Sequence, residues 1–61
     1  GLKELRKQAD LTQVELAKRT GIARTIISSY ETGRRDVRNM TLENALKISC
    51  ALNCQPSDLM R

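Results

Sequence analysis

The sequence predicts a single all-α domain of four or five helices, and three observations support this. Apolar residues recur at spacings of three and four, strand-like alternation of apolar and polar residues is absent, and no proline precedes Pro56. The chain has 61 residues, so residues 1–61 form one small domain. A domain of this size buries only about 60% of its unfolded surface, which excludes a deep, enclosed active site.

Capping residues predict the bounds of the first three helices. The first helix covers about residues 2–9. The second begins after Thr12, because Thr12 and Glu15 form a T-x-x-E capping box in which each side chain accepts the other residue's backbone N–H. It ends at Gly21, which readily adopts the left-handed conformation. The third helix covers about residues 24–31.

The rest of the chain predicts a loop and two further helices. Residues 34–40 form the loop, and Thr41 is a good N-cap for the fourth helix. A last short helix begins at Pro56, a favoured first-turn residue, and turns Leu59 inward. The predicted inner stripe of the fourth helix consists of Leu42, Ala45, Leu46, Ile48, Ser49 and Leu52.

Charge is distributed unevenly along the chain. The net charge is +4, and residues 1–40 hold nine basic and five acidic residues, whereas residues 41–61 hold two of each. The whole net positive charge therefore lies in the part of the chain that contains the second and third helices. Such a distribution is typical of a protein that binds a polyanion.

The sequence lacks the residues and motifs that most enzyme active sites and metal sites require. The sequence has no histidine, no glycine-rich phosphate loop and no nucleophile beside a base. Cys50 and Cys54 are the two thiols, too few for a four-ligand zinc site within one chain. We therefore expect no enzyme, no metal and no cofactor, with the cysteines packed as buried or half-buried hydrophobes in a reducing compartment. No apolar run is long enough to span a membrane, and we expect a cytoplasmic protein.

The third helix has an unusual outer face. At about 100° per residue, its inner side carries Ala23, Ile27, Tyr30 and Glu31. Its outer arc carries Arg24, Thr25, Ser28, Ser29 and Thr32. A plain solvated face is one interpretation, but such faces are usually rich in Glu and Lys. Arginine can bind guanine and threonine can contact thymine, so the predicted base-contacting residues are Arg24, Thr25, Ser28 and Ser29.

Residues outside this face complete the predicted site. A helix N-terminus and a side-chain amide can together bind a phosphate, which makes Gln13 a candidate. The loop after the third helix supplies three more candidates for phosphate contacts, Arg34, Arg35 and Arg38. Glu31 lies at the margin of the inner side, so it is either exposed or paired. A bidentate salt bridge between Arg6 and Glu31 would join the first helix to the third.

The chain resembles the Cro/cI-type, lambda-repressor-like DNA-binding domain over nearly its whole length. The order and spacing of the matching residues are specific, although each alone is weak. They are Leu5, Arg6, Leu11, Thr12, Gln13, Glu15, Leu16, Ala17, Gly21, Ile22, Ile27, Ser28, Tyr30, Glu31, Gly33, Leu42, Ala45, Leu46, Ile48, Ala51, Leu52, Pro56 and Leu59.

This resemblance implies a fold of four or five helices in which the second and third form a helix-turn-helix. It places the phosphate-binding glutamine at Gln13 and the bracing salt bridge at Arg6 and Glu31. It also places base reading at Arg24, Thr25 and Ser29, and backbone contacts around Arg34, Arg35 and Arg38. The chain departs from the family pattern at two positions. Ala23 stands where the family has a Ser or Thr cap, and Asn53 replaces a glycine.

We therefore expect a sequence-specific regulator of transcription, repressor-like, that binds double-stranded DNA in the bacterial or phage-infected cell and associates with the nucleoid. We also expect a homodimer on a two-fold-related operator, because one such domain reads only a few base pairs. The alternatives are the antitoxin of a toxin–antitoxin pair and a protein-interaction domain that has lost DNA binding. An exposed apolar patch around Val14, Ile26 and Val37 would favour these alternatives.

Overall fold

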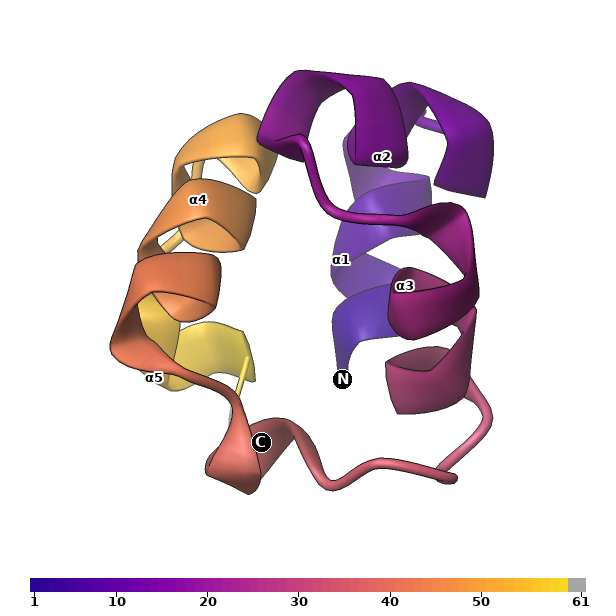
Figure 1. Cartoon of the computed structure of the whole chain (residues 1–61). Coiled ribbons are helices and arrows are strands. Elements are labelled where there is room, and N and C mark those ends of the chain that lie inside the picture. The colour runs from indigo at the N-terminus through magenta and orange to yellow at the C-terminus, as the bar shows by residue number, and fades with distance from the viewer. Residues whose placement is uncertain (60–61) are drawn as a thin grey trace.

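The computed structural model describes residues 1–59, and all regular elements in that range are helical (Figure 1). This confirms the predicted all-α fold class. Helix α2 packs against both α3 and α4, α4 packs against α5, and α1 packs against α3. The elements are α1 (Leu2–Gln8), α2 (Gln13–Thr20), α3 (Arg24–Glu31), the 3-10 turn η1 (Val37–Asn39), α4 (Leu42–Leu52) and α5 (Pro56–Leu59).

The bounds of α2 follow directly from its sequence. The Glu15 backbone N–H donates to the Thr12 hydroxyl at 3.1 Å, and the Thr12 N–H donates to the Glu15 carboxylate at 3.0 Å, which is the predicted capping box. The helix ends at Gly21, whose φ of 71° lies in the left-handed region. A glycine tolerates this conformation without strain. The chain then turns sharply and enters α3 within three residues.

The buried hydroxyl of Thr20 holds that turn in place. It donates to the Leu16 carbonyl at 2.8 Å and accepts the Ile22 backbone N–H at 3.2 Å. Thr20 is buried, so both bonds are shielded from water and no polar atom of this side chain lacks a partner. The angle between α2 and α3 is therefore set by hydrogen bonds as well as by packing.

The core lies where α2, α3, α4 and α5 meet. Each of these helices contributes one fully buried aliphatic side chain: Leu16, Ile27, Ile48 and Leu59. Burying one such side chain stabilises a fold by roughly 1.5–3 kcal/mol. Leu2 adds a contact from α1. Because the core draws on elements from the whole chain, the described residues form one structural unit.

Two predicted core positions of α4 are wrong. Leu42 is 72% exposed and Leu46 is 50% exposed. Ala45, Ile48, Ser49 and Leu52 are buried, as predicted. At about 100° per residue, Leu42 and Leu46 lie on the flank of that buried stripe. The neighbouring helices cover a narrower arc of α4 than the run of apolar residues suggested.

Three smaller differences also appear. Ala23 is exposed, because it precedes α3 and does not share the geometry of its inner face. Cys50 is exposed, whereas Cys54 is half-buried. The predicted loop 34–40 contains the 3-10 turn η1, whose N-cap is the Asp36 side chain. Within residues 1–59, no helix combines the length and the apolar character needed to cross a membrane.

Candidate nucleic-acid interface

Helix α3 lies on the opposite side of the molecule from α4 (Figure 1). Ile27 anchors the inner face of α3 in the core. On the outer face, Arg24 and Thr25 are exposed, and Ser28 and Ser29 are half-buried. The four predicted base-contacting residues therefore lie along one side of α3, and its first two residues are the most exposed of the four.

Among these four residues, Ser29 has its hydroxyl group bonded within the helix. The Ser29 hydroxyl donates to the Ile26 carbonyl at 2.6 Å. Its hydrogen is therefore used inside the helix, and only its lone pairs face outward as acceptors. Thr25 and Arg24, at the start of α3, are the more accessible of the predicted contacts.

The three loop arginines are not equivalent. Arg34 and Arg35 are exposed. Arg38 forms an ion pair with Asp36, in which Nη2 lies 3.3 Å from Oδ2. Hydrogen bonds from the backbone and side chain of Arg38 lower the pKa of Asp36. The sequence analysis did not include this pair, although a D-x-R spacing after a helix could have indicated it. The ion pair uses Nε and Nη2 of Arg38 and partly neutralises its charge, which should weaken its attraction to a phosphate.

The structure brings Arg6 and Glu31 together as a bidentate pair. Arg6 Nε donates to Glu31 Oε2 at 2.7 Å, and Nη2 donates to Oε1 at 3.0 Å. The two side chains are only 11% and 3% exposed. Burial raises the pKa of Glu31, but hydrogen bonds from Arg6 and Gln13 and the charge of Arg6 outweigh it and lower the pKa below its ordinary value. The remaining Arg6 nitrogen, Nη1, donates to the Leu11 carbonyl at 2.7 Å.

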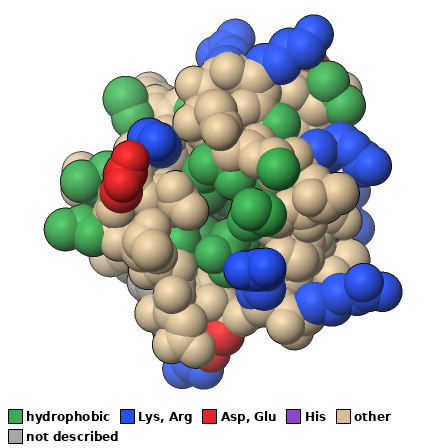
Figure 2. Space-filling view, in the orientation of Figure 1, with side chains coloured by type: hydrophobic (Ala, Val, Ile, Leu, Met, Phe, Trp, Pro, Cys, Tyr) green, Lys and Arg blue, Asp and Glu red, His purple; other side chains and the backbone are tan. Residues whose placement is uncertain are grey.

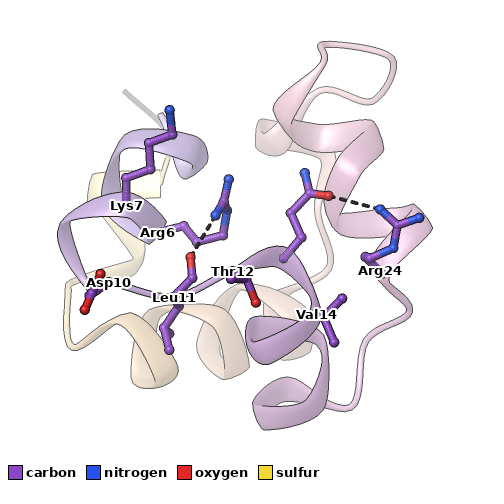
Figure 3. A pocket seen from close by; sticks show the side chains of 8 residues that line it. Arg6, Lys7, Asp10, Leu11, Thr12, Val14 and Arg24 are labelled. Atoms are coloured by element: carbon purple, nitrogen blue, oxygen red, sulfur yellow. Dashed lines mark hydrogen bonds between the residues drawn. The ribbon is translucent and has the colours of Figure 1, made fainter.

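Gln13 connects this buried pair to the outer face. Its Nε2 donates to Glu31 Oε1 at 3.1 Å, and its Oε1 accepts from Arg24 Nη1 at 3.3 Å. Figure 3 shows the second bond as a dashed line that joins the start of α2 to the start of α3. The sequence analysis missed both bonds, because the partners are 18 and 11 residues apart and no local pattern marks them.

Gln13 and Arg24 border a shallow hollow between α1 and the helix pair α2–α3 (Figure 3). In the view of Figure 2, several Lys and Arg side chains lie along the top and right of the molecule, on the side of α2 and α3. The hollow is lined by Arg6, Lys7, Asp10, Leu11, Thr12, Gln13, Val14 and Arg24. This surface has the charge and the polar side chains that a phosphate backbone requires.

No cluster of three or more His, Cys, Asp or Glu side chains lies together among residues 1–59. Cys54 is half-buried, and burial raises the pKa of its thiol, with Asp58 contributing in the same direction. A raised pKa makes this thiol a poorer nucleophile and metal ligand.

Comparison with known proteins identifies the family of the chain. A family model described as helix-turn-helix matches residues 2–59. The control protein C.BamHI of Bacillus amyloliquefaciens is 42% identical over 53 residues, which are 87% of this chain and 62% of that protein. The chain thus spans about three fifths of the length of this relative. No solved structure matches the chain. On the match over residues 2–59 and this identity, the chain belongs to the lambda-repressor-like helix-turn-helix family.

Proposed function

We propose that this chain is the DNA-binding domain of a sequence-specific transcriptional regulator. The observation that carries the proposal is the exposed polar face of α3, bordered by Gln13 and the loop arginines, within a helix-turn-helix fold. A similar protein is named as a control protein, which supports a regulatory role. We propose no catalytic activity and no cofactor, and we place the protein in the cytoplasm, on the nucleoid.

In the proposed complex, α3 lies in the major groove with its N-terminal residues against the base edges. Arg24 and Thr25 make the main base contacts, and Ser28 and Ser29 allow close approach because their side chains are small. Gln13 and the start of α2 bind one phosphate. Arg34, Arg35 and Arg38 bind the backbone on the other side of the groove, where they position the domain without reading sequence.

We further propose that two copies bind a two-fold-related operator as a homodimer. A single domain of this size reads too few base pairs to select one site in a genome. Two copies on half-sites one helical turn apart, about 34–36 Å, would supply the missing information. Sedimentation of the protein with and without its selected operator tests this, and a one-to-one complex on a non-repeated site would contradict it.

The two alternative functions receive less support. Of the three apolar residues that would favour a protein-interaction surface, Ile26 and Val37 pack against the core and only Val14 is exposed. Leu42 and Leu46 are also exposed, on α4. Helix α4 lies on the other side of the molecule from α3 (Figure 1), so an additional protein contact on α4 would be compatible with DNA binding.

Selection of bound sequences from a random DNA pool tests the main proposal. We expect a defined consensus for the natural protein and an altered consensus for Arg24→Ala, with a loss of about 1–3 kcal/mol at one base pair. Arg19→Ala is the matched control, because Arg19 is an exposed arginine at the end of α2, beside α4. Recovery of no consensus, or an equal effect of both variants, would overturn the assignment of this face.

Salt dependence tests the loop separately. We expect Arg34→Gln with Arg35→Gln to weaken binding to all sequences alike and to flatten the plot of log Kd against log salt by roughly 0.9 per lost phosphate contact. Lys47→Gln on α4 is the control and should leave the slope unchanged. An unchanged slope for the loop variant would remove the loop from the interface.

A further inference from the structure

We infer that Glu31 is a positioning residue for base recognition: it fixes the orientation of the Gln13 amide and thereby holds the Arg24 guanidinium at the start of α3. This inference rests on the proposed DNA-binding function. It assigns to Glu31 a role in specificity in addition to its contact with α1.

The chemistry of the three partners fixes the direction of every hydrogen bond. A carboxylate only accepts and a guanidinium only donates. The Gln13 amide, between Glu31 and Arg24, must therefore turn its NH2 group toward Glu31 and its oxygen toward Arg24, as the distances of 3.1 Å and 3.3 Å have it. The flipped amide would place its oxygen against the carboxylate and its NH2 against the guanidinium, and both bonds would be lost.

Glu31 is itself held firmly enough to impose this orientation. Its carboxylate is 3% exposed and accepts two hydrogen bonds from Arg6. Arg6 is held in turn by the Leu11 carbonyl. The network therefore runs from a buried, doubly bonded ion pair, through the half-buried Gln13, to the exposed Arg24.

The consequence is a pre-ordered arginine in the free protein. An exposed arginine loses much rotamer entropy when it binds a base. A guanidinium already held near its bound position loses less, and the difference appears as tighter binding to the correct base. Thr25, the other exposed residue at the start of α3, makes no side-chain hydrogen bond in the described chain and lacks this support.

The alternative is that Glu31 acts only on stability. A purely structural residue would change the folded fraction, and with it the binding of all DNA sequences by the same factor. A positioning residue changes the ratio of two affinities. The measurement is therefore a discrimination ratio of two Kd values. The denominator is the Kd for the selected operator. The numerator is the Kd for an operator changed at one base pair, the one that Arg24→Ala no longer distinguishes.

The experiment compares two single variants with a swapped double variant. Glu31→Gln removes the fixed carboxylate, and Gln13→Glu sets two carboxylates against each other. We expect each to lower the discrimination ratio by roughly five- to tenfold, close to the size of one base contact. In the double variant, the glutamine at position 31 accepts from Arg6 and donates to the carboxylate at position 13, which accepts from Arg24. The bonds that join positions 31, 13 and 24 are restored, so we expect the ratio to recover, whereas the second contact with Arg6, from Nη2, is lost because it meets the NH2 group.

Ile48→Val is the stability control. Ile48 lies fully buried in α4, outside the network, and this change should lower the melting temperature while the discrimination ratio stays at its natural value. The double variant should also bind all DNA more weakly than the natural protein, because its carboxylate at position 13 lies near a phosphate.

The outcomes distinguish a failure of this inference from a failure of the proposed DNA-binding function. If Arg24→Ala changes no base preference, the proposed base reading fails and the inference fails with it. If Arg24→Ala lowers the ratio but Gln13→Glu does not, the function stands and the positioning role is overturned. Loss in both single variants without recovery in the double variant also overturns it. Should Glu31→Gln not fold, Gln13→Glu and the double variant decide the question.

Discussion

Helices α2 and α3 have the same length of eight residues, but they are held in different ways. Helix α2 begins with a complete capping box formed within four residues of sequence. Helix α3 begins at Arg24, and the residue before it, Ala23, provides no side-chain cap. Its fixed end is the other one, where Glu31 bonds to Arg6, 25 residues away. The supporting helix is thus specified locally, whereas the helix proposed to contact DNA is held by tertiary contacts that leave its start uncovered.

The largest expected effect concerns the tertiary anchor of α3. Glu31→Ala leaves the Arg6 guanidinium poorly hydrated and without its ionic partner. Removal of one member of a buried ion pair typically costs about 3–5 kcal/mol, which is much of the stability of a small domain. Urea unfolding measures the change. A double-mutant cycle with Arg6→Ala should show strong coupling, and additive effects would mean that the pair does not hold α3.

Protonation of Glu31 by acid should also weaken the Arg6–Glu31 ion pair, with a smaller loss of stability than Glu31→Ala. The pKa of Glu31 in the folded protein lies below its ordinary value. The stabilisation is therefore complete above the ordinary glutamate pKa of about 4.3 and is lost as pH falls toward the lowered value. We expect the free energy of unfolding to fall more steeply below about pH 5 in the natural protein than in Glu31→Gln. Parallel pH profiles of the two proteins would contradict this.

Removal of the α2 cap should have a medium effect. Thr12→Ala abolishes the bond to the Glu15 backbone N–H, and the loss of such a cap costs about 1 kcal/mol. Thermal unfolding followed by circular dichroism measures the change. Thr25→Ala is the matched control, since Thr25 is an exposed threonine inside a helix and its truncation should stay within about 0.5 kcal/mol.

The smallest expected effect is a gain. Residue 23 has φ −59° and ψ 139°, an extended conformation compatible with an N-cap. Ala23→Ser should therefore supply the missing cap and stabilise the protein by up to about 1 kcal/mol. Ala23→Gly, which adds no hydrogen-bonding side chain, should give a smaller change. A melting temperature for Ala23→Ser below that of the natural protein would show that a serine at this position does not cap α3.

The features that could be predicted from sequence are those that depend on a few adjacent residues. The capping box at Thr12, the left-handed Gly21 and the cap at Thr41 each depend on a few adjacent residues, and the structure has them as predicted. Asn53 likewise adopts the left-handed conformation, with φ 55°.

The features that could not be predicted depend on what packs against a helix. Leu42 and Leu46 are exposed because the neighbouring helices cover only a narrow arc of α4. The spacing of apolar residues in the sequence does not reveal the width of this arc. The bonds of Gln13 depend on the angle between α2 and α3. The base and phosphate contacts remain predictions, because they require a DNA partner.

The two partners of Arg6 have a consequence for how the chain folds. One partner, the Leu11 carbonyl, is five residues away, and the other, Glu31, is 25 residues away. Closure of a loop of about ten residues takes only 10–100 ns, and longer loops close at a higher entropy cost. We expect the short contact to form first and to order the arginine side chain. The distant carboxylate then meets a guanidinium that is already in place, so docking of α3 loses less side-chain entropy than it would with a free arginine.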